Sequence, residues 1–286
     1  MERKFKVAGI GELLWDVLPS GKQIGGAPFN FAYHAGQVGC EPYVISAIGN
    51  DKLGTEILEK ANQLGIYSDY IQKNKYSTST VTVRLDQNGH PDYTIHENVA
   101  WDYMQWHSDM NELSEKIDAV CFGSLAQRNP VSAETIYSFL EAVKPSCLKV
   151  FDINLRQQYY NKENIYKSLQ LTNVLKLNDE ELPVLSGYFQ LTGNVNDQLN
   201  LLIEKFNLEY IVYTMGSKGS IIITSGDYSV MDAPKVKVRD TVGAGDAFTA
   251  TFIAGLLHKK SIAEIQKIAT EVAAVVCTQV GAITDL

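Results

Sequence analysis

Short apolar runs alternate with longer helix-like segments along most of this 286-residue chain, and this alternation constrains the fold most strongly. Runs that are apolar at nearly every position predict strands buried on both faces, as in a parallel sheet covered by helices. We expect such strands at residues 6–11, 43–48, 119–122, 149–153, 174–177 and 210–213. Helices are expected at residues 27–38, 52–64, 132–143, 162–171, 179–185, 196–206, 244–258 and 262–279. The pattern predicts an α/β fold with helices on both faces of a mostly parallel central sheet.

One segment departs from this alternation of buried strands and helices and predicts a second, smaller β-structure. Residues 78–85 (TSTVTVRL) and 92–96 alternate polar and apolar side chains around residues 86–89, whose Asn-Gly pair is typical of a turn. We therefore expect half-exposed antiparallel strands here, with residues 13–24 as a further candidate. No repeat or linker-like tract interrupts the chain. The organisation expected is one domain over residues 1–286, with a small β lid built from about 12–24 and 76–104.

The charge balance narrows the classes of partner. The formal net charge is −8, which argues against nucleic acid or an anionic membrane as the main partner. An acidic chain still binds an anionic nucleotide where a few local donors outweigh the overall field. No apolar run has the length needed to span a bilayer, and the charged start at residues 1–6 does not resemble a signal peptide. We expect a cytoplasmic protein.

The strongest chemical signal is the stretch at residues 240–248 (DTVGAGDAF), which opens an apolar helix. Small residues at Gly243, Ala244 and Gly245 leave backbone N–H groups uncovered at the positive end of the helix dipole, which makes an anion cradle. Asp246 in the first turn is either a capping residue or a general base that accepts the proton of an attacking hydroxyl. Taken alone, these residues leave both interpretations open.

Two motifs in the right order resemble those of the ribokinase-like (PfkB-type) carbohydrate kinases. Residues 240–248 are similar to the C-terminal motif of that family, and residues 25–32 (GGAPFNFA) with 48–54 (IGNDKLG) are similar to its N-terminal motif. The resemblance covers essentially the whole chain and is nearest to bacterial fructokinases. It implies a three-layer α/β/α fold with a β lid, and transfer of the γ-phosphoryl group of MgATP to a small sugar. Fructose, converted to fructose 6-phosphate, is the expected substrate.

The resemblance implies a sugar pocket beside the first strand. Its expected members are Asp16, Gly25, Gly26 and Asn30, and the two glycines make physical sense because a ring with many hydroxyls needs close approach to the backbone. Trp101 lies in residues 99–102 (VAWD), which resemble the fructokinase group. Its ring either stacks on the sugar or packs at the hinge of the lid, and the sequence does not separate these.

A second group of residues is expected along the path of the phosphoryl group. Residues 152–156 (DINLR) follow a predicted strand and so lie at the carboxyl edge of the sheet, where open α/β sheets bind ligands. By resemblance Asn154 lies near the substrate, and Arg156 neutralises phosphate charge by a bidentate contact. The turn containing Thr214, Gly216 and Gly219 resembles one that lies along the nucleotide phosphates.

The metal sites implied by the resemblance are less clearly marked. Asn178 and Glu181 match an N-x-x-E motif that organises Mg²⁺ through its water shell, although Asp179 and Glu180 between them are better explained as acidic residues at a helix start. Asp240, with the backbone at residues 242 and 281, is a candidate for binding a monovalent cation such as K⁺. The adenine pocket is expected at the last two helices, with no residue assigned.

The sequence disfavours some other classes of nucleotide-binding protein and leaves several acceptors open. The chain has no Walker A motif and no H-R-D or D-F-G run, and the third glycine of a dinucleotide-binding fingerprint would fall at Leu14. Other acceptors for a kinase are ribose, a nucleoside, 2-keto-3-deoxygluconate or a sugar phosphate, and the last is disfavoured because residues 78–96 offer only Arg84 as a cation of the Lys/Arg type. A non-catalytic sugar-binding regulator is a further possibility. An edge sheet also favours a homodimer formed through the lid.

Overall fold

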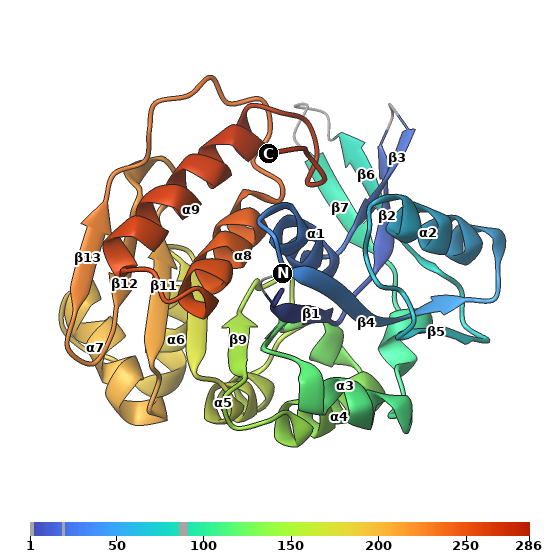
Figure 1. The fold of residues 1–286 in the computed structure, drawn as a ribbon, viewed down its shortest axis with the longest axis horizontal. Coiled ribbons are helices and arrows are strands. Elements are labelled where there is room, and N and C mark those ends of the chain that lie inside the picture. Colours follow the sequence, from blue (N-terminus) through green and yellow to red (C-terminus); the bar gives the residue numbers. More distant parts are fainter. Residues whose placement is uncertain (1–2, 19–20, 86–90) are drawn as a thin grey trace.

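The computed structural model of the protein describes residues 3–18, 21–85 and 91–286. Its main sheet has seven parallel strands: β1 (Lys6–Ile10), β4 (Glu41–Gly49), β5 (Ile71–Asn74), β8 (Ala119–Phe122), β9 (Leu148–Asp152), β10 (Val174–Asn178) and β11 (Tyr210–Thr214). Two antiparallel strands complete one edge: β12 (Ser220–Ile223) and β13 (Tyr228–Met231). The strand order is β13-β12-β11-β10-β9-β8-β1-β4-β5 (Figure 1). The predicted parallel sheet is confirmed.

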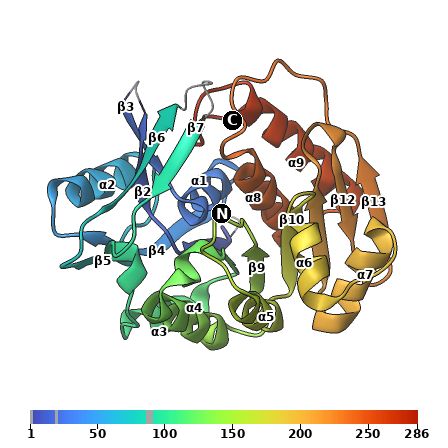
Figure 2. The same ribbon diagram turned by 180° about the vertical axis from the view of Figure 1, so that it is seen from behind.

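Helices cover both faces of this sheet (Figures 1 and 2). One face carries α1 (Ala27–Gln37), α2 (Lys52–Gln63), α8 (Ala244–Leu257) and α9 (Ile262–Cys277). The other carries α3 (Asp109–Lys116), α4 (Pro130–Ala142), α5 (Lys162–Leu171), α6 (Leu182–Phe189) and α7 (Val195–Phe206). Alternate residues of β4 show the division, because Val44 and Ile48 pack with α1 and α2 whereas Ile45 and Ala47 pack into the core on the opposite face. The three-layer prediction is therefore confirmed.

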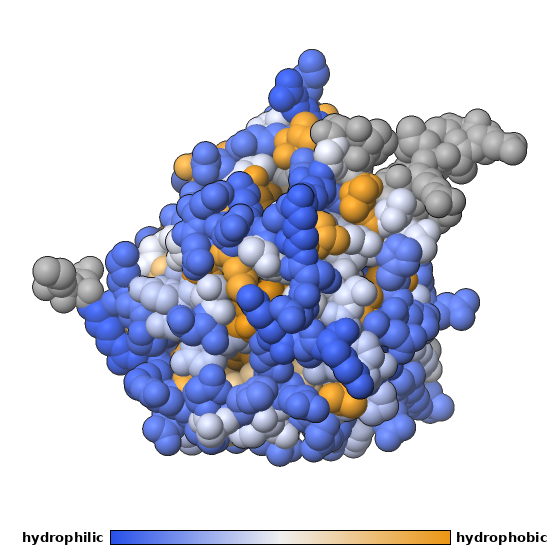
Figure 3. Space-filling model, turned by 90° about the vertical axis from the view of Figure 1, so that its right-hand side faces the viewer, coloured by the Kyte–Doolittle hydropathy of each residue, from blue (hydrophilic) through white to orange (hydrophobic). Residues whose placement is uncertain are grey.

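A separate four-stranded sheet forms the lid, in the order β3-β2-β6-β7. Its strands are β2 (Leu14–Leu18), β3 (Gly21–Gly25), β6 (Ser79–Leu85) and β7 (Pro91–Ile95). The antiparallel pairing of β6 with β7 is as predicted, while the turn predicted at residues 86–89 lies outside the described residues. Figure 3 turns the lid side of the molecule toward the viewer, where hydrophilic side chains predominate and apolar patches lie between them.

Two details of the fold differ from the sequence-based expectation. The inner strands β2 and β6 pair in parallel rather than antiparallel, because α1, β4, α2 and β5 separate them and provide the long crossover that parallel pairing requires. Helix α6 begins at Leu182 rather than at Asp179, because the Asn178 side chain accepts the N–H groups of Glu180 and Glu181 and holds a turn there. Among the described helices, none has the length and apolar character needed to cross a membrane.

Candidate active site

A cavity of about 1300 Å³ lies at the carboxyl ends of the parallel strands, next to the lid. This is the edge at which open α/β sheets bind ligands, because the loops that follow the strands converge there. Side chains from three parts of the fold line it. The end of β10 contributes Asn178, and the loops after β1, β9 and β11 contribute Glu12, Asn154 and Gly216. The lid contributes Leu14, Asp16, Val81 and Ile95, and the helical side contributes residues of α1, α8 and α9.

The cradle predicted from the sequence forms the first turn of α8. Gly243 caps this helix with a φ of 81°, and a Cβ at this position would lie 2.7 Å from the Cα of Ala282, so glycine is required on both grounds. Gly243, Ala244 and Gly245 all line the cavity. Their N–H groups lie at the positive end of the α8 dipole, which makes this turn suitable for binding an anion.

Asp246 lies in the first turn of α8 and also lines the cavity. Its Oδ2 atom accepts a hydrogen bond of 2.8 Å from the Nδ2 of Asn30 on α1, which fixes the carboxylate between two helices. Burial raises the pKa of Asp246 to about 7, and the negative charge of Asp152 adds to this; Asn30, Lys176 and Arg156 oppose the rise. A carboxyl group with a pKa near neutrality is suited to act as a general base.

A buried ion pair lies beneath the cradle, and the sequence analysis did not assign it a role. The Nζ atom of Lys176 on β10 lies 3.0 Å from an Asp152 oxygen on the neighbouring strand β9, where the two residues are paired in register. Burial alone lowers the pKa of Lys176, but the charges of Asp152, Glu181 and Asp246 outweigh it and raise the pKa overall. Lys176 therefore stays protonated. Its Nζ atom lies close to the first turn of α8, since a Cβ at Gly245 would be 3.1 Å from it. This places a fixed cation at the anion cradle.

The lid contributes Asp16 to the cavity from strand β2. A Cβ at Gly25 on the adjacent strand β3 would lie 2.4 Å from the Asp16 Oδ2 atom, so the glycine makes room for this carboxylate. Burial raises the pKa of Asp16 to about 6, while Arg156 opposes this. Gly26 and Asn30 line the same part of the cavity, as predicted. These four residues are thus brought together.

Glu12 is a further acid in this part of the cavity that the sequence analysis did not single out. It follows β1 and is almost completely buried, and its Oε1 atom accepts a hydrogen bond of 3.3 Å from the Ala27 N–H. Within the described residues its Oε2 atom and the Oδ1 atom of Asn30 are buried without a hydrogen-bond partner. Burial raises the pKa of Glu12 to about 7. Two residues that line the cavity and each keep an unpaired oxygen acceptor suit a ligand that carries several hydroxyl groups.

Arg156 and Asn154 lie where the sequence predicts them. Both follow β9 and line the cavity, and the Arg156 side chain is exposed to it. Its positive charge lowers the pKa values of Glu12, Asp16 and Asp246, so it acts electrostatically on three acids of the site.

The phosphate turn predicted after β11 also faces the cavity. Thr214, Gly216, Gly219 and Asn178 all line it. Beyond this turn the cavity wall is built from the loop before α8 and from α9, and it is apolar at Val236 and Val238 but also contains Lys235. Val236 and Val238 are 39% and 57% exposed, and Cys277 of α9 faces the same space. Exposed valines in a cavity wall are suited to the flat face of a base. These two valines lie in the loop before α8, whereas the sequence predicted the adenine pocket at the last two helices without naming residues.

Glu181 occupies a different position from that of a direct metal ligand. Its side chain is buried, does not line the cavity, and accepts the N–H groups of Leu155 (3.0 Å) and Asn178 (2.8 Å). Burial raises its pKa, while Lys176 and the two amides oppose this. Glu181 thus ties together the loops after β9 and β10. The described ranges hold no group of three or more His, Cys, Asp or Glu side chains arranged to bind a metal ion.

Asp240 joins the two backbone segments that the sequence associated with it. Its carboxylate oxygens accept the N–H groups of Val242 (3.1 Å) and Gly281 (2.9 Å). The loop that enters α8 and the C-terminal loop are therefore held together next to the cradle.

Trp101 requires a correction. Its side chain is 0% exposed and does not line the cavity, so it does not contact a ligand there. The ring packs in the core beneath the lid because the following Asp102 and the facing Arg128 hold this segment against the main domain. Of the two roles left open by the sequence, packing at the lid hinge is the one that the structure supports.

The fold and the site together place a helix N-terminus that is suited to an anionic ligand beside a buried carboxylate. The chain belongs to the pfkB family of carbohydrate kinases, whose family model matches residues 17–286. It is therefore a sugar kinase by family.

Individual relatives are similar at modest identity. An uncharacterized sugar kinase from Pyrococcus horikoshii has a crystal structure with a TM-score of 0.84 to this chain, at 27% identity over 97% of this chain and 93% of the other. Its structure in complex with ATP gives a TM-score of 0.81. A fructokinase from Klebsiella pneumoniae is 29% identical over 88% of this chain and 84% of its own. An ATP-dependent 6-phosphofructokinase from Thermoanaerobacterium thermosaccharolyticum is 24% identical over 100% and 92%.

Proposed function

We propose that the protein transfers the γ-phosphoryl group of MgATP to a hydroxyl of an uncharged sugar. The sugar we propose is fructose, and the product is fructose 6-phosphate. The observation that carries this proposal is the carboxylate of Asp246, held by Asn30 in the first turn of α8 with the Lys176 cation beside the same turn. One cavity thus combines a base, an anion cradle and a fixed cation.

The residues of the site divide the chemistry between them. Asp246 accepts the proton of the sugar hydroxyl as its oxygen attacks the γ-phosphorus. The N–H groups of Gly243, Ala244 and Gly245 and the Lys176 ammonium hold the charge that develops on the transferring group. Arg156 offsets charge on the other side of the path. Positioning and electrostatics supply most of the rate enhancement in a transfer of this kind.

The sugar end of the cavity favours an uncharged acceptor. Among the described side chains, Glu12 and Asp16 are acids there, and the cation that acts on both is Arg156. Carboxylates accept hydrogen bonds from hydroxyl groups but repel a second phosphate, which disfavours a sugar-phosphate acceptor. Fructose is preferred among uncharged sugars because of the similarity to fructokinases. Ribose, a nucleoside and 2-keto-3-deoxygluconate are the alternative acceptors.

The nucleotide end combines the polar turn at Thr214, Gly216 and Gly219 with the apolar wall at Val236 and Val238. We place the phosphates along the turn and the adenine against the valines. Mg²⁺ prefers oxygen ligands and keeps much of its water shell, so it enters with the phosphates of ATP. In this proposal Asn178 and Glu181 order the loop that faces the water shell of the ion, and K⁺ binds near Asp240.

The proposal also covers the organisation of the protein. The chain acts as one domain with its lid over the sugar, which excludes water from the transfer. A cytoplasmic homodimer forms through the lid, whose edge strands β3 and β7 offer unpaired backbone groups to a second copy. Sedimentation velocity at micromolar concentration tests this arrangement, and a monomer at all concentrations would reject it.

A coupled ADP-release assay tests the function directly. The protein is given MgATP with fructose, ribose, glucose, adenosine or 2-keto-3-deoxygluconate, each with and without K⁺. We expect strong turnover with fructose and stimulation by K⁺. Turnover with another sugar alone would keep the mechanism and reject the substrate. Binding of a sugar without turnover would support a non-catalytic sugar-binding regulator instead.

The turnover number is expected to fall at acid pH. Burial and Asp152 raise the pKa of Asp246 to about 7, so below this pH the carboxyl is protonated and cannot accept the proton of the sugar. We expect kcat to decrease about tenfold for each pH unit below the midpoint and to level off above it. The measurement is kcat at saturating ATP and sugar from pH 5.5 to 9. A flat profile across this range would remove Asp246 from the role of base.

The variant Asp16→Ala is expected to weaken sugar binding selectively. Loss of a charged acceptor in a mostly buried position is expected to raise the KM for the sugar by about 10–100-fold. The KM for ATP should change less than about twofold, because Asp16 lies on the lid. Asp179→Ala is the matched control, since this acid also lines the cavity but on the nucleotide side. An ATP-binding defect in Asp16→Ala would refute the placement of the sugar.

A further inference from the structure

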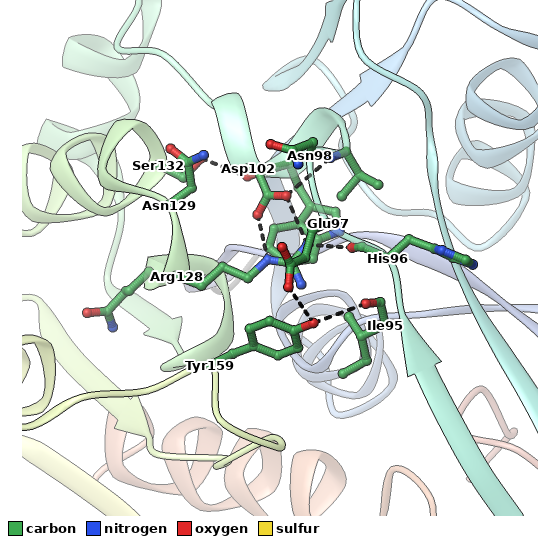
Figure 4. Close-up of polar contacts among 12 residues, drawn as sticks. Ile95, His96, Glu97, Asn98, Asp102, Arg128, Asn129, Ser132 and Tyr159 are labelled. Atoms are coloured by element: carbon green, nitrogen blue, oxygen red, sulfur yellow. Dashed lines mark hydrogen bonds and ion pairs between the residues drawn. The ribbon is translucent and has the colours of Figure 1, made fainter.

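The chain leaves the lid through a segment that lies outside the catalytic machinery. Strand β7 ends at Ile95, and after four residues the chain enters a 3-10 helix, η1 (Ala100–Tyr103). A second 3-10 helix, η2 (Leu125–Arg128), follows β8 in the main domain. Figure 4 shows how side chains of the main domain meet this exit segment.

A bidentate ion pair joins the two 3-10 helices. The Nε and Nη2 atoms of Arg128 donate to the two carboxylate oxygens of Asp102, at 2.7 and 2.9 Å (Figure 4). The exposed fractions of the two side chains are only 7% and 2%. The guanidinium also lies over the ring of Trp101, with its Cζ 4.1 Å from the ring centroid. Arg128 is therefore held in one orientation by charge, hydrogen bonds and stacking.

The same guanidinium reaches the exit of the lid. Its Nη2 atom donates a hydrogen bond of 2.6 Å to the carbonyl oxygen of His96, the first residue after β7. Tyr159 of the main domain supports the same segment, since its hydroxyl donates to the Glu97 carboxylate (2.9 Å) and lies 3.3 Å from the carbonyl oxygen of Ile95. Arg128 itself lies over the Tyr159 ring. Two consecutive carbonyl groups at the end of the lid strand are thus held by the main domain.

The residue between these contacts and the site is Ile95. Its side chain lines the cavity and pairs across the lid sheet with Val81, which also lines the cavity. Leu125, at the other end of η2 from Arg128, lines the cavity as well. A displacement of the Ile95–His96 backbone would therefore move part of the wall beside the sugar.

We infer that the Asp102–Arg128 pair is a positioning clamp, which fixes the exit of strand β7 so that Ile95 closes the sugar side of the cavity. This inference rests on the proposed function for its kinetic consequences. Stability alone does not account for the pair, because well-packed apolar residues of similar volume can often replace a buried ion pair at no loss of stability. The additional bond from Arg128 to His96 is what an apolar pair cannot reproduce.

Three variants separate positioning from stability. Arg128→Met breaks the pair and leaves Asp102 buried without its cation. The double variant Asp102→Leu with Arg128→Met removes both charges, so it is expected to regain most of the lost thermal stability. Lys144→Met is the matched control: Lys144 donates to Asp118 at 2.6 Å, and Asp118 precedes β8 at the amino edge of the sheet, opposite the cavity.

Two readouts are compared, one with turnover and one without. We expect the KM for the sugar to rise by about 10–100-fold in both clamp variants, with the KM for ATP nearly unchanged and the sugar KM of Lys144→Met normal. Hydrogen exchange of the amides at residues 94–98, measured on the protein alone, is expected to be faster in both clamp variants and unchanged in Lys144→Met.

The double variant Asp102→Leu with Arg128→Met distinguishes a positioning role of the ion pair from a purely structural role. If it regains wild-type exchange at residues 94–98 together with its stability, the pair is only structural and the clamp is rejected. A normal sugar KM in Arg128→Met would also overturn the inference. If the wild-type protein phosphorylates no sugar, the proposed function fails, and hydrogen exchange still tests the clamp by itself.

Discussion

Asp246→Asn is expected to lower kcat by about 10²–10⁴-fold or more, which is the usual effect of removing a general base. Asparagine has nearly the same shape and keeps an oxygen to accept the hydrogen bond from Asn30 Nδ2, so the first turn of α8 should remain intact. The amide cannot take up a proton at neutral pH. The measurement is kcat with saturating MgATP and sugar, together with the thermal unfolding midpoint.

Binding provides the control for this variant. The KM values for both substrates should stay within a few-fold of wild type, since Asp246→Asn leaves the cradle at Gly243–Gly245 and the acids Glu12 and Asp16 unchanged. Near-normal turnover in a folded Asp246→Asn protein would show that Asp246 only caps the helix, which is the alternative that the sequence left open.

Lys176→Met should have the second large effect, on stability and on turnover together. It leaves Asp152 buried without its cation; the other described side-chain contact of this carboxylate is the hydroxyl of Thr249, at 3.4 Å. Breaking a buried pair in this way costs about 3–5 kcal/mol of the free energy of unfolding. Turnover should also fall, because the cation beside Gly245 is lost. Denaturant unfolding and kcat are the measurements.

The double variant Asp152→Asn with Lys176→Met separates these two effects. Removing the unpaired charge should restore much of the stability, whereas kcat should remain low because no cation returns to the cradle. Recovery of kcat together with stability would mean that Lys176 acts only through folding. A stable single variant with normal kcat would contradict both parts of the prediction.

Much of the fold could be predicted from the sequence because the spacing of apolar residues differs between the two kinds of strand. Strands β8 and β10 are apolar at nearly every position, which indicates burial on both faces of the strand. Strand β6 alternates polar and apolar residues, which indicates that only one face is buried. The edge strand β13 and the polar helix α3 carry no such pattern and were not predicted, whereas β12 (SIII) does carry a buried apolar run that was overlooked. The parallel pairing of β2 with β6 depends on tertiary arrangement, which local periodicity does not contain.

In the candidate site, too, some residues could be predicted from local motifs, and others are identified only from tertiary contacts. The positions of Asp16, Asn30 and Asp246 follow from motifs, because glycine-rich turns and helix starts have local signatures. Lys176 and Glu12 were overlooked, although a lysine within the apolar run VLKLN is a visible anomaly that calls for a buried partner. That partner, Asp152, is identified only when β9 and β10 are aligned side by side. The clamp of Arg128 on the lid exit likewise depends on contacts distant in sequence.

The phosphoryl transfer itself is measured by following the γ-phosphoryl group of ATP into the sugar. The protein is incubated with MgATP and fructose, and the products are followed by phosphorus NMR until the ATP is consumed. We expect ADP and fructose 6-phosphate to appear in equal amounts, with little inorganic phosphate. Inorganic phosphate without a sugar phosphate, or unchanged ATP in the presence of each candidate sugar, would contradict it.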